Sequence, residues 1–114
     1  MRLYNMTFDA HDPCALATFW SGVVDRPVSE GANEFFATID RTPTEPALLF
    51  LRVPEGKTAK NRMHMDLDCD DLGAARQRLE SLGASFVHEK DEFGLRWMTF
   101  QDPEGNEFCI AAHG

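Results

Sequence analysis

The segment RMHMDLDCDDLGAARQRLESLG, from Arg62 to Gly83, decides the fold. Its first eight residues alternate strictly between apolar and polar side chains, which is typical of a half-buried β-strand. The apolar members are Met63, Met65, Leu67 and Cys69, and the polar members are Arg62, His64, Asp66 and Asp68. A helix capped by Asp70 or Asp71 follows, and its apolar stripe consists of Leu72, Ala75, Leu79 and Leu82. Because this stripe must cover the apolar face of the strand, we expect the polar face to line a wet or ligand-filled cavity.

The same order of elements is predicted on both sides of this segment. Downstream, strands are expected at 85–90, 96–101 and 106–112, with turns at Glu92-Phe93-Gly94 and Asp102-Pro103-Glu104-Gly105-Asn106. Upstream, a strand at 2–9 precedes a helix that starts at Asp12-Pro13 and has Gly22 near its end. Further strands are expected at 26–30, 34–40 and 47–53. The pattern β-α-β-β-β therefore occurs twice.

The two halves superpose at an offset of 59 residues, which places Asn5 on His64 and Asp12 on Asp71. Residue identity between the halves is low, so the repeat is one of pattern. Neither half has enough strands to cover its own apolar face. We therefore predict an α+β fold, a single domain over 1–114 built from two βαβββ modules, at approximately 1–56 and 60–114.

Composition narrows the class of protein. The chain has 114 residues, 43% of them hydrophobic, which suits one globular domain. Its net charge of −8 argues against a nucleic-acid partner and against binding to an anionic membrane. The cysteines Cys14, Cys69 and Cys109 form no CxxC pair, and no apolar run suggests a signal or membrane segment. These features predict a cytoplasmic protein with reduced thiols.

Three stretches resemble the vicinal oxygen chelate superfamily, which includes glyoxalase I, bleomycin-resistance proteins and extradiol dioxygenases. They are DPCALATFW at 12–20, HMDL at 64–67 with LESLGA at 79–84, and DPEGNEFC at 102–109. The resemblance is closest to the glyoxalase-like branch and covers nearly the whole chain. It implies that the two modules form one domain whose curved sheets surround a shared concave cavity.

The resemblance also implies where metal ligands would lie. In the metal-dependent members of the superfamily, each module supplies a ligand from its first strand and another from its last. These positions correspond here to Asn5, Phe50, His64 and Cys109. Since His64 is the one good ligand for a divalent metal in this set, we expect no resident metal. The alternative is a site for Zn, Ni, Mn or Fe that uses His64 and Glu107, with Asp66 nearby.

The expected site follows from the same positions and from the polar face of the strand. The ligand-binding residues would be Asn5, Phe50, Arg62, His64, Asp66, Trp97 and Cys109, and the catalytic residues His64 and Glu107. His64 could bind a ligand or act as a general base, or it could be a structural histidine that ties strands together.

The leading hypothesis is a homodimeric, glyoxalase-like protein that binds an organic ligand without a cofactor. Two alternatives remain open: a metal-dependent lyase, isomerase or dioxygenase, and a drug-sequestering resistance protein. Metal content would identify the first, and turnover of a captured compound would separate an enzyme from a sequestering protein. These functional hypotheses rest on the family resemblance, because a fold alone does not determine a function.

Overall fold

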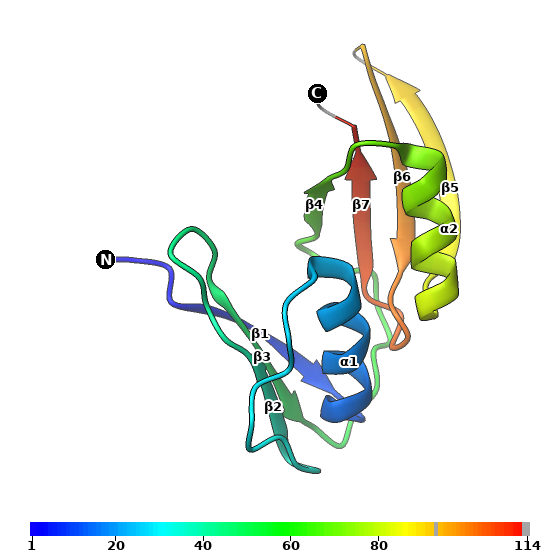
Figure 1. Ribbon diagram of the computed structural model, residues 1–114. Helices are drawn as coiled ribbons and strands as arrows, with labels where there is room; N and C mark the ends of the chain where they lie inside the picture. The colour runs from blue at the N-terminus through cyan, green and yellow to red at the C-terminus, as the bar shows by residue number, and fades with distance from the viewer. Residues whose placement is uncertain (93, 113–114) are drawn as a thin grey trace. The chain divides into compact units, whose positions relative to one another are not determined.

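The computed structural model describes residues 1–92 and 94–112, and Figure 1 shows the arrangement of its helices and strands. In chain order the elements are β1 (Asn5–Ala10), α1 (Pro13–Val24), β2 (Phe36–Ile39), β3 (Ala47–Arg52), β4 (Met65–Asp68), α2 (Leu72–Leu82), β5 (Ser85–Glu92), β6 (Leu95–Gln101) and β7 (Glu107–Ala111). The chain divides into two compact units, residues 1–56 and 57–114. Among the described helices, none is long and apolar enough to cross a membrane.

The first unit is a three-stranded sheet with α1 packed against it (Figure 1). The strand order is β1-β3-β2, with β1 parallel and β2 antiparallel to β3. Asp12 caps α1 as predicted, because its side chain accepts a hydrogen bond of 3.1 Å from the backbone N–H of Ala15. The helix continues past Gly22 and ends at Asp25, which takes the left-handed conformation at φ 57°.

The prediction of a strand at 26–30 is wrong. The structure has a single bridge there, between Val28 and Ile39, supported by a 2.8 Å hydrogen bond from Ser29 N to Thr38 O. Pro27 offers no backbone N–H to a strand ladder, so the pairing stays short. Over its described residues the first unit thus has β-α-β-β order, with the bridge where the pattern predicted one more strand.

The second unit has the full βαβββ order. Its sheet runs β4-β7-β6-β5, in which β4 is parallel to β7 and the other neighbours are antiparallel. Asp71 caps α2 and Gly83 ends it at φ 111°, so the helix boundaries match the prediction. In the predicted turn between β5 and β6, Phe93 lies outside the described residues. The α+β class and the pattern of this half are confirmed.

One face of this sheet is covered by α2 (Figure 1). Leu79 of the helix is buried, and the guanidinium of Arg76 lies 3.7 Å from the ring centre of Phe86 on β5. Phe100 on β6 continues this layer, with its ring centre 5.5 Å from that of Phe86 and 5.9 Å from that of Phe108 on β7. The aromatic side chains thus fill the helix-covered face, and the alternate residues of each strand point to the other face.

Candidate functional site

A pocket of about 640 Å³ lies in the second unit, on the sheet face away from α2. This volume is in the range of sites that hold small organic ligands. Every strand of the sheet contributes to its lining, as does the segment that precedes β4. The lining residues on which the argument depends are His64, Asp66, His88, Lys90, Trp97 and Cys109.

A row of polar side chains crosses the floor of this pocket. Residues paired on neighbouring strands project from the same face of a sheet. Across the four strands the paired residues are, in order, Asp66, Cys109, Thr99 and His88. The middle two are buried, and the hydroxyl oxygen of Thr99 lies 3.2 Å from the sulfur of Cys109. The row thus has a buried centre and two more exposed ends.

The side chains of His64 and Asp66 are in contact at one end of the row. The distance from His64 Nε2 to Asp66 Oδ1 is 3.2 Å, and the two side chains are 45% and 69% exposed. They lie two residues apart, so the alternation of the strand puts both on the pocket face. Asp66 can orient the imidazole, which is then placed to accept or donate a proton or to bind a polar group of a ligand.

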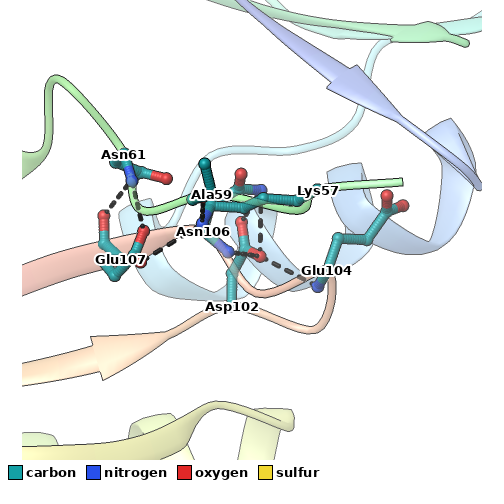
Figure 2. A network of polar contacts seen from close by, with 7 residues as sticks. All are labelled: Lys57, Ala59, Asn61, Asp102, Glu104, Asn106 and Glu107. Carbon is teal, nitrogen blue, oxygen red and sulfur yellow. Dashed lines mark hydrogen bonds and ion pairs between the residues drawn. The ribbon is translucent and has the colours of Figure 1, made fainter. Parts of the chain in front are cut away.

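Glu107 lies in the pocket lining, but its carboxylate is already engaged (Figure 2). One oxygen lies 3.2 Å from the ammonium of Lys57, and the other accepts a 3.2 Å hydrogen bond from the backbone N–H of Asn61. The side-chain amide of Asn61 also donates to the backbone carbonyl of Glu107 at 3.0 Å. These contacts hold the segment 57–61 against β7, and that segment carries Lys60 into the pocket lining. They favour a positioning role for Glu107 over the expected catalytic one.

The same contacts lower the pKa of Glu107. Burial by itself would raise this pKa, but hydrogen bonds from the backbone of Glu107 and Asn61, together with the Lys57 ammonium, bring it below its ordinary value. A carboxyl whose pKa is lower in the folded state stabilises the fold at pH values above its unfolded pKa. That contribution is lost as the pH falls through the folded pKa.

We expect Glu107→Gln to lower the free energy of unfolding at neutral pH, because the amide cannot replace the charge that faces Lys57. The difference from the unchanged protein should shrink as the pH falls from about 6 to about 3, as the carboxyl becomes protonated. Urea denaturation at a series of pH values measures it. A difference that stays constant over this range would show that the charge of Glu107 contributes nothing to the clamp.

The structure brings most of the expected site residues together. His64, Asp66, Trp97, Glu107 and Cys109 all line the one pocket described above. Arg62 is exposed and lies outside the lining. Asn5 belongs to the first unit, where it is half-buried and its amide nitrogen lies 3.4 Å from the hydroxyl of Thr7.

Phe50 is a core residue, which corrects its expected role in ligand binding. In the second unit Asp66 pairs with Cys109, whereas in the first unit Thr7, the counterpart of Asp66, pairs with Leu49. Leu49 is therefore the counterpart of Cys109, and the predicted position was one residue too late. A shift of one residue reverses the face of a strand. Phe50 accordingly pairs with Phe8, stacks on its ring at 5.0 Å and is fully buried.

The metal set that the family resemblance implies does not fit these residues. After the correction, its four positions hold an amide at Asn5, a hydrocarbon at Leu49, an imidazole at His64 and a thiol at Cys109. Among the described residues, donor atoms of His64, Asp66 and Cys109 do lie within 4.8 Å of one another. Each of these already has a polar partner: His64 and Asp66 contact each other, and Cys109 contacts Thr99.

Two pocket residues, His88 and Lys90, were not predicted from the sequence. They share strand parity with Phe86, whose ring lies under α2, so regular alternation would put them on the helix-covered face. The pairing of β5 with β6 shifts between Phe86 and His88, and Val87 lies between these two paired residues. This irregularity turns His88 and Lys90 into the pocket. The sequence signal was the change from the phenyl ring of Phe86 to the polar side chains of His88 and Lys90, all at alternate positions of one strand.

Comparisons with known proteins agree with this architecture. A glyoxalase/bleomycin resistance protein/dioxygenase family enzyme from Burkholderia phytofirmans PsJN is 16% identical, with a TM-score of 0.80 over 98% of both chains. The oxidase ChaP-H2 is 21% identical, with a TM-score of 0.74 over 100% of this chain and 94% of the other. Lactoylglutathione lyase from Agrobacterium tumefaciens is 16% identical, with a TM-score of 0.69 over 98% of this chain and 93% of the other.

At these identities the solved structures establish the fold alone. A search of curated proteins found no match. The family model described as a glyoxalase-like domain matches residues 5–111, which is nearly the whole chain. The chain therefore belongs to the glyoxalase-like domain family, within the vicinal oxygen chelate superfamily.

Proposed function

We propose that the protein binds a small organic molecule in the pocket on the face of the sheet β4-β7-β6-β5 that lies away from α2, without a resident metal. The observation that carries this proposal is the pocket itself, with its volume of about 640 Å³ and its mixture of aromatic and polar lining. Ligand sites typically combine an apolar wall with a few polar groups that orient the ligand. Trp97 supplies such a wall, and the row from Asp66 to His88 supplies the polar groups.

In this proposal the pair formed by His64 and Asp66 is the polar centre that meets the ligand. Asp66 holds the imidazole in place, so His64 can hydrogen-bond to the ligand and, if the ligand is converted, move a proton on it. Glu107 has a positioning role through the segment 57–61. Cys109 and Thr99 form the buried floor between the two ends of the row.

We expect His64→Ala to weaken ligand binding by about tenfold or more while leaving the free energy of unfolding within about 0.5 kcal/mol, since His64 is half exposed. 4-Hydroxyphenylacetate and 4-hydroxyphenylacetamide serve as ligand probes, because their phenol hydroxyl gives His64 a group to bind at the far end of the ring. NMR titration of ¹⁵N-labelled protein measures their binding. Shifts should concentrate on residues of β6 and β7 that line the pocket. Arg62→Ala is a matched control outside the lining, and it should leave binding unchanged.

Unfolding of the His64→Ala protein would mean that His64 is structural, and unchanged binding would mean that it does not meet the ligand. The same preparations, made without a metal-affinity tag, should contain far less than one equivalent of Zn, Ni, Mn or Fe by elemental analysis. Failure of both probes to shift the pocket residues at millimolar concentration would contradict the binding proposal.

A second candidate is a metal-dependent enzyme, and the convergence of His64, Asp66 and Cys109 within 4.8 Å favours it. A histidine, a carboxylate and a thiolate are all ligands that Zn²⁺ accepts. Stoichiometric metal that disappears in both His64→Ala and Cys109→Ser would replace the first proposal with this one.

The proposal also includes a cytoplasmic homodimer. In both units the outer strands of the sheet have an edge that no described strand pairs with, and such edges favour association with another chain.

A further inference from the structure

We propose that the ligand of this pocket is a small organic anion, whose carboxylate lies against His88 and Lys90 while its apolar body contacts Trp97. This inference rests on the proposed function and names the chemical class of the ligand. Three observations carry it: the irregularity in β5, the balance of charge in the lining, and the placement of Trp97 beside Lys90.

The irregularity in β5 brings two basic side chains into the pocket. Phe86 pairs with Phe100, but the next pair along the strand is His88 with Thr99, and then Lys90 with Trp97 follows after one further residue. With regular pairing, both His88 and Lys90 would face α2. Strand irregularities of this kind are common beside functional sites, where they redirect side chains. Here the result is a basic wall along the β5 side of the pocket.

The charges of the lining leave the ammonium of Lys90, on this wall, without an ion-pair partner among the described residues. The lining contains two carboxylates, of Asp66 and Glu107, and the ammonium groups of Lys60 and Lys90. Glu107 is paired with Lys57, and Asp66 contacts His64. Within residues 1–92 and 94–112, the structure shows no ion pair for Lys60 or Lys90. Unpaired cations in the pocket of a chain with net charge −8 favour an anionic ligand.

The position of Trp97 determines where the apolar body of the ligand lies when its carboxylate contacts Lys90. Trp97 is the pairing partner of Lys90, so an aromatic ring that packs on the indole lies next to the ammonium. The pair of His64 and Asp66 belongs to the opposite edge of the sheet, three strand spacings away, or roughly 14 Å. A ligand of one ring with a carboxylate at one end therefore directs its other end toward His64.

The test compares a carboxylate with its neutral amide in the full-length protein. 4-Hydroxyphenylacetate and 4-hydroxyphenylacetamide have the same shape and differ in charge, so the ratio of their dissociation constants isolates the charge term. We expect 4-hydroxyphenylacetate to bind at least about fivefold more tightly at low salt, and this preference to fall as salt is added. Lys90→Gln should remove most of the preference, and Lys90→Gln combined with His88→Gln should abolish it, with little change in 4-hydroxyphenylacetamide binding.

Arg96→Gln is the matched control, because it removes the same charge from β6. Arg96 contacts Glu89 and alternates with Trp97, so it lies on the other face of the sheet. This variant should keep the preference for the carboxylate. Equal binding of the two probes to the unchanged protein, or a preference that survives loss of both basic residues, would overturn the anion inference and leave the binding proposal standing. Failure of both probes to bind would overturn the proposed function and this inference with it.

Discussion

Replacing Phe50 by alanine is expected to lower the free energy of unfolding by about 3–5 kcal/mol. The side chain is fully buried and stacks on Phe8, which also contacts Trp20 of α1 with ring centres 5.5 Å apart. Truncation at this site removes a large apolar surface from the core and leaves a cavity that the surrounding aromatic rings cannot fill. Urea denaturation followed by circular dichroism measures the change.

Leu51 is the matched control for this substitution. It follows Phe50 on β3, faces the other side of the sheet and is 39% exposed. Leu51→Ala should therefore cost less than about 1.5 kcal/mol. Equal costs at the two positions would contradict the assignment of Phe50 to the core. A stable Phe50→Ala protein that no longer binds ligand would restore the ligand-binding role first expected for this residue.

Much of the second unit could be predicted from the sequence because its first strand and its helix each follow a clear periodic pattern. The alternation around His64 and Asp66 has a polar and an apolar face, and the stripe on α2 was expected to cover the apolar one. The helix packs mainly against β5, and Met63 of the apolar face is 69% exposed, so that part of the prediction is wrong. The strand alternation by itself puts both polar side chains on one face, and the structure places them in the pocket lining on the face away from α2. The caps at Asp71 and Gly83 were equally readable, since each depends on a local backbone conformation.

The remaining features depend on pairing between strands, which local patterns do not reveal. Phe50 was chosen as the counterpart of Cys109 by assuming that the offset between the two units is constant. The offset between their last strands is one residue larger than the offset between their first strands, so the counterpart is Leu49. The irregularity at Val87 likewise arises from how β5 aligns with β6, so His88 and Lys90 looked like helix-side positions. In both cases a change of one residue exchanges the two faces of a strand.

Asp102→Ala, which removes the carboxylate, is expected to lower the free energy of unfolding by about 2–4 kcal/mol. Asp102 is only 3% exposed, and its side chain organises the turn between β6 and β7 (Figure 2). One oxygen accepts hydrogen bonds from the backbone N–H groups of Glu104 at 2.9 Å and Asn106 at 3.0 Å. The other accepts from the side-chain amide of Asn106 at 2.8 Å. Alanine would leave these donors without their acceptor.

The effect of Asp102 should extend to the pocket, because this turn aligns β7 with β6. Gln101 pairs with Glu107, directly across the turn, and that register places Cys109 beside Thr99. Asp102→Asn is the graded comparison: it keeps an acceptor for the two backbone N–H groups but directs an amide toward Asn106, so it should cost about half as much as alanine. Denaturation of both variants gives the two costs, and NMR shifts of Thr99 and Cys109 report the register. An alanine variant with unchanged stability would show that the turn holds this register without the carboxylate.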